Sequence, residues 1–189
     1  MTTLRKAGSY SKKYARPNTR VSKKRSKAYI KTVPQSKIVK FNIGNKNLYD
    51  AGKFNTEIKL VAKEKVQIRD NAIESSRQYI ARKLEKDIPG NFYFEIRTYP
   101  HHILRENKMM AMAGADRMQS GMKHSFGRTS GRAAIVNQGK DIFLIAVSGE
   151  KNARVARQTL QSIKAKIPCK SHITIKKAIP SLEDKPLYI

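Results

Sequence analysis

The sequence predicts an α+β fold, with two helices packed on one side of a mixed, mainly antiparallel sheet, plus a basic N-terminal extension. Short runs in which apolar and polar residues alternate indicate strands, and two longer segments carry apolar residues at helical spacing. Their order is two strands, a helix, a strand, a long loop, two strands, a helix and a last strand. A length of 189 residues suits a single domain.

The first half of the domain contains two predicted strands and a helix. Residues 39–43 alternate in character and end at Gly44-Asn45, a pattern typical of a strand and turn. Residues 58–62 alternate in the same way. A helix is expected from about residue 68 to 86, and Pro89-Gly90 ends it. Its inward face consists of Ala72, Ile73, Ser76, Ile80 and Leu84.

The second half of the domain contains four predicted strands and a second helix. Residues 92–96 alternate and predict a strand. Residues 133–136 and 142–147 flank Asn137-Gln138-Gly139-Lys140, which predicts a hairpin. The run 142–147 is apolar on both faces, so it is expected at the centre of the sheet. A helix over 152–166, with Val155, Ala156, Leu160 and Ile163 inward, precedes a last strand around Ile173 and Ile175.

Charge restricts the possible partners. Forty basic residues against fourteen acidic ones give a formal net charge of +26. A field of one sign this large favours binding to a polyanion, of which nucleic acid is the commonest. An anionic membrane surface is the alternative, but no apolar run approaches the ~20 residues of a membrane span. Cys169 is the only cysteine, which excludes an internal disulfide and a cysteine-based zinc site. No metal or cofactor is expected.

Residues 1–36 form a basic block of their own. No acid precedes Asp50, three tyrosines are interleaved, and no hydrophobic segment of a secretory signal is present. A solubilising tail or a transit peptide are alternatives, but lysine predominates over arginine and tyrosine can stack on unpaired bases, which favours an RNA-binding extension. The cations expected to contact RNA phosphates are Arg5, Lys6, Lys12, Lys13, Arg16, Arg20, Lys23, Lys24, Arg25, Lys27 and Lys31.

The segment 105–132 is expected to be a long functional loop. It contains every methionine except the first residue, four glycines, and six basic residues against two acids. Glycines disfavour a long helix, and methionine adapts to irregular surfaces. The composition therefore predicts a loop that lies against a bulky anion, with Lys123, His124, Arg128 and Arg132 as further RNA contacts. A surface loop that packs its methionines on its own core is the alternative.

A catalytic alternative rests on the histidines. A nuclease or RNA-modifying enzyme could use His101, His102 and His124 as general acids or bases. However, adjacent residues in a strand point to opposite faces, and the spacing matches no metal or acid–base motif. The phosphate-binding motif G-x-x-x-x-G-K-[ST] is also absent. The sequence therefore predicts a protein that is not an enzyme.

Several motifs resemble one family. They are Asn107-Lys108-Met109, Ala113-Gly114-Ala115-Asp116-Arg117-Met118-Gln119, Gly121-Met122 and Ser125-Phe126-Gly127, with Gln67 to Glu74 and Pro34 to Ile38. Together they resemble the large-subunit ribosomal protein family called L-ten-e in archaea and eukaryotes, the counterpart of bacterial L-sixteen. The resemblance runs from the extension to Ile179, so the expected parts are the extension 1–36, a domain over 37–179 and a tail over 180–189.

The resemblance implies a place in the cytoplasmic ribosome. It implies a sheet with two helices that sits on large-subunit rRNA, and a central loop that reaches toward the peptidyl-transferase region and helps to position tRNA. The 5S rRNA and neighbouring ribosomal proteins are further expected partners, and a membrane is not. The loop residues expected at the tRNA site are Arg105, Asn107, Lys108, Met109, Met110, Met112, Gly114 and Arg117.

Overall fold

The structure, a computed structural model, describes residues 32–106 and 128–177, together with Gly8, Lys24, Ser26 and Ile30. Within these residues the elements are β1 (Asn42–Gly44), α2 (Lys46–Asp50), β2 (Thr56–Ala62), β3 (Val66–Arg69), α3 (Asp70–Asp87), β4 (Phe92–Ile96), β5 (His102–Glu106), β6 (Arg128–Val136), β7 (Asp141–Val147), α5 (Glu150–Ile163), the 3-10 turn η2 (Lys164–Lys166) and β8 (Ser171–Lys177).

These strands form two sheets. The larger has the order β1-β4-β7-β2-β8 and the smaller β3-β6-β5. Among the described strands, every pairing is antiparallel. The α+β class is confirmed, but two antiparallel sheets replace the expected single mixed sheet.

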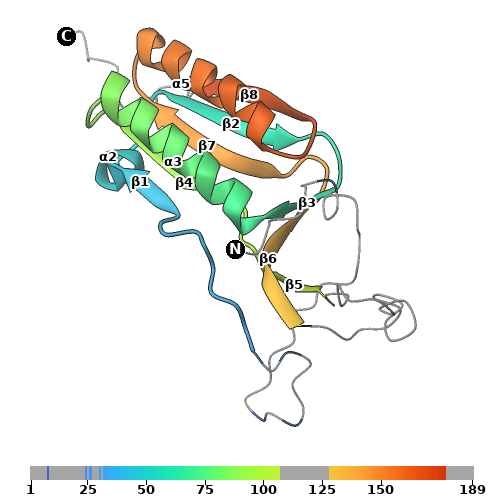
Figure 1. The fold of residues 1–189 in the computed structure, drawn as a ribbon. Helices are drawn as coiled ribbons and strands as arrows, with labels where there is room; N and C mark the ends of the chain where they lie inside the picture. The colour runs from blue at the N-terminus through green and yellow to red at the C-terminus, as the bar shows by residue number, and fades with distance from the viewer. Residues whose placement is uncertain are drawn as a thin grey trace, which may run out of the picture.

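Two helices cover one face of the larger sheet. Figure 1 shows α3 and α5 side by side over the strands. The inward residues of α3, Ile73, Ile80 and Leu84, are at most 1% exposed. Ala156 and Leu160 of α5 are completely buried in the same core. The predicted apolar faces are therefore confirmed, although the helices begin at Asp70 and Glu150 rather than at about 68 and 152.

Strand β7 is the middle strand of five, as its apolar run predicted. Its residues Phe143 and Ile145 face the main core under α3 and α5. Leu144 and Ala146 point to the opposite face, into a second cluster with Phe54 and Tyr93. The short helix α2 covers that cluster, since the Tyr49 ring stacks on Tyr93 with centroids 4.4 Å apart. A strand buried on both faces needs apolar side chains throughout.

Helix α2 was not predicted. Its start is marked by Asn45, whose side-chain oxygen accepts a hydrogen bond from the Leu48 amide at 3.2 Å. The sequence Gly44-Asn45 predicts a turn after the strand, but an asparagine at this place can also be the N-cap of a helix. The first strand is correspondingly short, and Val39 lies outside it, 72% exposed.

Two sequence predictions were wrong. The helix was expected to begin at about residue 68, but residues 68 and 69 belong to strand β3. The residues on either side of the 137–140 turn do not form a hairpin, because β6 pairs with β3 and β5, whereas β7 pairs with β2 and β4. The turn itself is present, with the Lys140 amide donating to the Asn137 carbonyl. It carries the chain from one sheet to the other.

The smaller sheet extends away from the helices (Figure 1). Four segments join it to the larger sheet, namely residues 63–65, residues 70–91 with helix α3, residues 97–101 and residues 137–140. Backbone hydrogen bonds hold together the seam, which is the region where the two sheets meet. Among them, the Arg97 N–H donates to the Ile142 carbonyl and the Gly139 N–H donates to the Ala62 carbonyl. The small sheet is therefore firmly held where it meets the body and carries the ends of the predicted loop.

Candidate nucleic-acid interface

The predicted loop begins and ends on the smaller sheet. Arg105 and Glu106 belong to β5, and residues 128–132 belong to β6, so the expected loop limits of 105 and 132 were too wide. Glu106 lies opposite Arg128 in the antiparallel register, and Arg105 lies opposite Thr129. The chain thus leaves and returns through neighbouring strand ends. This arrangement anchors two arginines, Arg105 and Arg128, at the root of the loop.

Most of the predicted contacts lie outside the described residues. For the loop these are Asn107, Lys108, Met109, Met110, Met112, Gly114, Arg117, Lys123 and His124. For the extension they are Arg5, Lys6, Lys12, Lys13, Arg16, Arg20, Lys23, Arg25, Lys27 and Lys31. The structure does describe Lys24, Arg105, Arg128 and Arg132.

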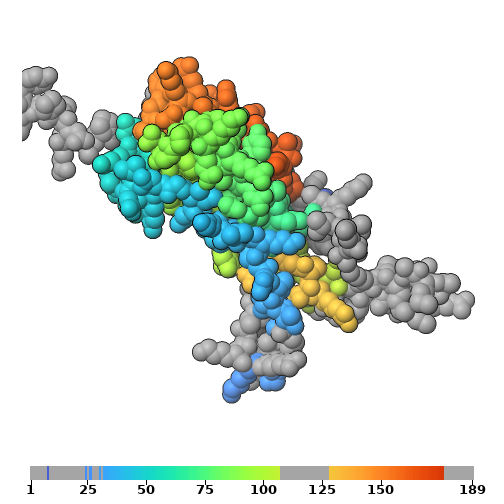
Figure 2. Space-filling view, turned by 60° about the vertical axis from the view of Figure 1, so that its left-hand side comes forward, coloured from blue at the N-terminus to red at the C-terminus, as the bar shows by residue number. Residues whose placement is uncertain are grey.

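Arg132 links the extension to the root of the loop. Its Nε donates a hydrogen bond of 2.7 Å to the Pro34 carbonyl, and one of its terminal nitrogens lies 3.5 Å from the Tyr99 hydroxyl. The charged, short bond to Pro34 is of the stronger kind. The segment before β1 crosses the surface to reach β6 (Figure 2). Arg132 was predicted as an RNA contact, and part of its guanidinium is used inside the protein.

Two carboxylates on α3 hold the same segment further along. Asp70 accepts from the Lys37 amide at 3.1 Å, and Glu74 accepts from the Val39 amide at 3.3 Å. Between these two amides, the Ile38 side chain is buried in the main core. Sequence reasoning missed Asp70 and Glu74, which lie more than thirty residues away from the segment they hold.

Glu74 is the centre of a small polar network. Arg77 donates to it at 2.6 and 2.8 Å, and the Gln78 amide donates at 3.0 Å. The bond from Arg77, outweighing the effect of burial, lowers the pKa of the Glu74 carboxyl. Glu74 is therefore ionised at neutral pH and can accept the Val39 amide. The acid resembles a structural anchor more than a reactive group.

The histidines are placed in different surroundings. The His101 ring is exposed and packs against Tyr99, with ring centroids 4.5 Å apart. His102 is only 7% exposed within β5, and burial, followed by the charge of Arg105, lowers the pKa of its imidazole. His124 lies outside the described residues. In the part of the chain that the structure describes, no cluster of His, Cys, Asp and Glu could hold a metal ion.

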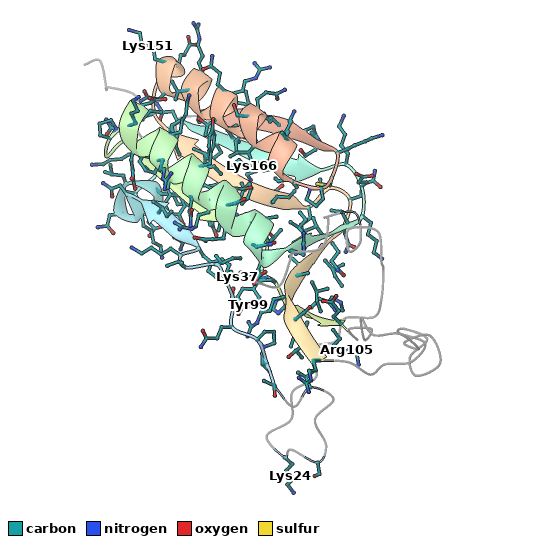
Figure 3. All side chains as sticks on the ribbon, viewed as in Figure 1. Lys24, Lys37, Tyr99, Arg105, Lys151 and Lys166 are labelled. Atoms are coloured by element: carbon teal, nitrogen blue, oxygen red, sulfur yellow. The ribbon has the colours of Figure 1, made fainter. Side chains whose placement is uncertain are left out.

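Cations dominate the surface around these groups. The described ion pairs use only a few of them, such as Arg97 with Glu95 at 3.2 Å and Lys59 with Glu57 at 3.3 Å. With 40 basic and 14 acidic residues, most cations have no carboxylate to pair with. Figure 3 shows basic side chains from Lys151 on α5 to Arg105 on the small sheet. Such a surface gains free energy by displacing counterions from a polyanion.

Neither the cysteine nor the helices indicate another class of function. Burial, followed by the charge of Glu64, raises the pKa of the Cys169 thiol to about 11, so the reactive thiolate is scarce at neutral pH. None of the helices in the described ranges has the length and apolar character that a membrane crossing requires.

The chain was compared with known proteins. A family model described as Ribosomal protein L16p/L10e matches residues 17–174. The large ribosomal subunit protein uL16 of Thermofilum pendens is 46% identical over 151 residues, which cover 79% of this chain and 87% of that protein. The uL16 protein of Staphylothermus marinus is 39% identical over 181 residues, which cover 95% and 98% of the two chains. The uL16 protein of Methanococcus maripaludis (strain C7) is 40% identical over 162 residues, covering 84% and 89%. With most of its length matched, the chain belongs to the ribosomal protein L16p/L10e family.

Proposed function

We propose that this protein is a structural constituent of the large ribosomal subunit in the cytoplasm and catalyses no reaction. The extension and the small sheet bind large-subunit rRNA, and the loop over 107–127 helps to position tRNA near the peptidyl-transferase region. The 5S rRNA and neighbouring ribosomal proteins are further partners. Family membership supports the place of the protein in the ribosome, and the positive charge supports RNA as the partner.

One observation supports the assignment of rRNA binding to the extension and of tRNA positioning to the loop. The Arg132 guanidinium joins the Pro34 carbonyl of the extension to the strand that ends the loop, at 2.7 Å. Arg105, at the root of the loop, lies on the side of the molecule away from Lys151 (Figure 3), and the Arg132 bond holds the Pro34 segment to the same small sheet. Cations on two such segments can bind phosphates in different parts of one folded RNA. Phosphate contacts fix the position of the protein on the RNA and do not depend on the base sequence.

The body acts as the rigid support of both segments. Loops on rigid scaffolds are common carriers of function. The antiparallel pairing from His102–Ala133 to Glu106–Arg128 fixes where the loop leaves and returns. The anchors Asp70 and Glu74 fix the direction in which the extension leaves. The protein can therefore present two cationic segments to RNA without refolding its core.

Sedimentation of a cell lysate at physiological salt tests the assignment to the ribosome. The protein should migrate with large subunits. Recovery mainly in slow soluble fractions, or with membranes, would contradict the proposal. Recovery of nuclease or RNA-modifying activity from the purified protein, lost on replacement of His101 or His102, would favour the catalytic alternative.

A loop replacement tests the separate role of the loop. Met109 to Asp116 is exchanged for a Gly-Ser linker of equal length. Folding and entry into subunits should stay near wild-type levels, since the strand pairing from His102–Ala133 to Glu106–Arg128 lies outside the replaced segment. Binding of tRNA to purified subunits and peptide synthesis should both fall. Normal tRNA binding and synthesis would show that the segment only fills space.

Removal of the extension tests RNA affinity. We place the cut before Ile30 rather than after residue 36, because Ile30 is 3% exposed and Pro34 is held by Arg132. The shortened protein should bind an rRNA fragment more weakly and with a flatter salt dependence, since fewer counterions are released. Unchanged affinity and salt slope would show that the extension makes no phosphate contacts.

A further inference from the structure

A pocket lies at the seam between the two sheets. Two connections border it, residues 97–101 leading from β4 to β5 and residues 137–140 leading from β6 to β7. It has a volume of about 460 Å³ and is lined by Arg97, Thr98, Tyr99, His101, His102, Ala134, Ile135 and Lys140. This volume falls in the range of small-ligand pockets and suits a single nucleotide. No family motif quoted above falls on these residues.

The lining combines rings with positive charge. Tyr99 is 46% exposed, with its ring stacked on Phe41 at a centroid distance of 5.4 Å and tilted against His101 at 4.5 Å. Rings held in this way can stack on an unpaired base at little further entropic cost. Lys140 is exposed on the opposite connection and, among the described residues, makes no ion pair. Its ammonium is free to bind phosphate.

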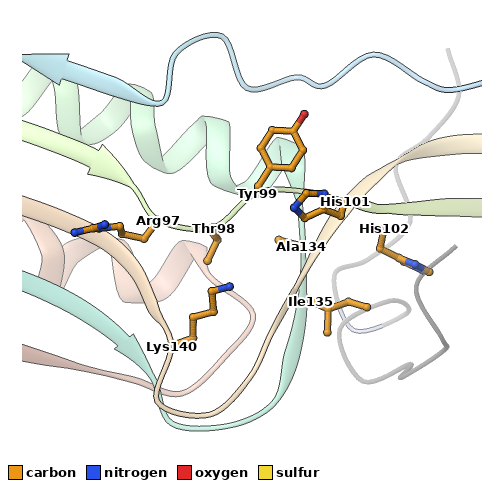
Figure 4. Close-up of a pocket in the computed structure, with 8 residues that line it drawn as sticks. All are labelled: Arg97, Thr98, Tyr99, His101, His102, Ala134, Ile135 and Lys140. Atoms are coloured by element: carbon orange, nitrogen blue, oxygen red, sulfur yellow. The ribbon is translucent and has the colours of Figure 1, made fainter. Parts of the chain in front are cut away.

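The pocket also contains a polar group without a partner. Thr98 is only 2% exposed, and its hydroxyl makes no hydrogen bond. Buried hydroxyls nearly always have a partner, so an orphan at a pocket wall calls for a ligand that supplies one. Figure 4 shows the Lys140 side chain extending toward Thr98, with Arg97 to one side and the His101 ring to the other. Thr98, Lys140 and the two rings all line this one pocket. In Figure 4 the Tyr99 ring points to the side of the connection away from Lys140, so the rings and the ammonium lie at different parts of the wall.

We propose that this seam pocket binds one unpaired nucleotide of RNA. The base contacts the rings of Tyr99 and His101 and the apolar wall of Ala134 and Ile135. Lys140 binds the phosphate, and the Thr98 hydroxyl bonds to a polar atom of the base or ribose. This site rests on the proposed RNA-binding function and adds a defined contact on the body of the protein, apart from the extension and the loop.

The first test uses assembled subunits. Large subunits that contain the full-length chain are irradiated with ultraviolet light, digested, and analysed by mass spectrometry for nucleotide adducts. An adduct on Tyr99 or His101 is expected. Absence of adducts from residues 97–102 and 134–140, in subunits shown to contain the protein, would overturn the proposal while leaving the ribosomal assignment intact. Failure of the protein to enter subunits would instead contradict the assignment.

The second test uses the full-length chain and short RNAs. Lys140→Gln and His101→Ala should each weaken binding of a single-stranded oligonucleotide roughly 5- to 30-fold, in line with the loss of stacking or of a defined phosphate contact. Lys151→Gln on α5 removes the same charge as Lys140→Gln far from the pocket and should change affinity less than about threefold. Both pocket side chains are exposed, so folding should persist. Equal affinities of the Lys140 and Lys151 variants would overturn the site.

Thr98→Val separates binding from structure. Valine keeps the shape of threonine but lacks the hydroxyl, so the free variant should unfold at the same or a higher temperature, because no buried bond is lost. Its affinity for single-stranded RNA should nevertheless fall severalfold. A loss of stability without a loss of affinity would mean that Thr98 is structural. Competition by a mononucleotide, with RNA affinities equal across all variants, would assign the pocket to a free nucleotide and overturn the proposal.

Discussion

Replacing Arg132 with methionine should loosen the junction between the extension and the small sheet. The bond from Arg132 Nε to the Pro34 carbonyl is short, at 2.7 Å, and its donor is charged. The contact with the Tyr99 hydroxyl at 3.5 Å contributes little. A hydrogen bond to a charged group contributes about 1.5–3 kcal/mol, and partial exposure of this one favours the lower figure. We therefore expect the substitution to destabilise the junction by about 1.5 kcal/mol. The Pro34 segment should then detach from the small sheet roughly ten times more often.

Amide hydrogen exchange measures this opening directly. The Lys37 and Val39 amides donate to Asp70 and Glu74, so they exchange only when the segment leaves α3. Their exchange should accelerate about tenfold in the Arg132→Met protein, with the amides of β7 unchanged. Arg128→Met is the matched control, because it removes the same charge from an exposed position on the same strand. Equal acceleration in both variants, or none in either, would refute the role of Arg132 as a clamp.

Three further predictions concern stability. Gly44→Ala should cost about 2–4 kcal/mol, because φ is +93° and the new Cβ would lie 2.3 Å from the Phe92 carbonyl oxygen. Gly139→Ala, with φ of +78° but open space around it, should cost only about 1–2 kcal/mol, and thermal melting compares the two. Burial depresses the pKa of His102 below its ordinary 6.5, so the unfolded chain binds more protons, and stability should be full above pH 6.5 and fall as the pH decreases. In His102→Gln this part of the pH dependence of the melting temperature should vanish, and an unchanged profile would contradict it. Glu74→Gln should cost about 1–3 kcal/mol at neutral pH by weakening the bonds to Arg77 and Val39, measured by urea unfolding. Since the folded pKa of Glu74 is lowered, its contribution should disappear as the pH falls below the ordinary 4.5, where the variant and the wild type should converge.

The sequence alone predicted the structure correctly wherever buried residues recur at the spacing of a helix or a strand. Ile73, Ile80 and Leu84 share a helix face whatever the rest of the chain does, and they are buried as expected. The alternation over 92–96 and the doubly apolar run over 142–147 identified β4 and the central strand β7. The net charge and the central motifs likewise depend on composition and local order, and the family match agrees with them.

Tertiary structure decided which segments meet. The turn at 137–140 is a local feature, but the partners of β7 depend on the burial available beside β2 and β4. The turn therefore connects the two sheets and does not close the predicted hairpin. The Val66–Arg69 run is too short for its period to separate a strand from a helix, and pairing with β6 made it a strand.

In the candidate sites, too, the sequence shows the residue types, and the tertiary structure determines which of them meet. Lysine- and arginine-rich segments are visible in the sequence, but the joining of Pro34 to Arg132 spans 98 residues and has no local signal. The seam pocket likewise assembles Thr98 and Tyr99 with Lys140, which are neighbours only because two connections cross between the sheets. Local periods determine which faces are buried, whereas contacts between distant residues follow from competition among all apolar surfaces for a partner.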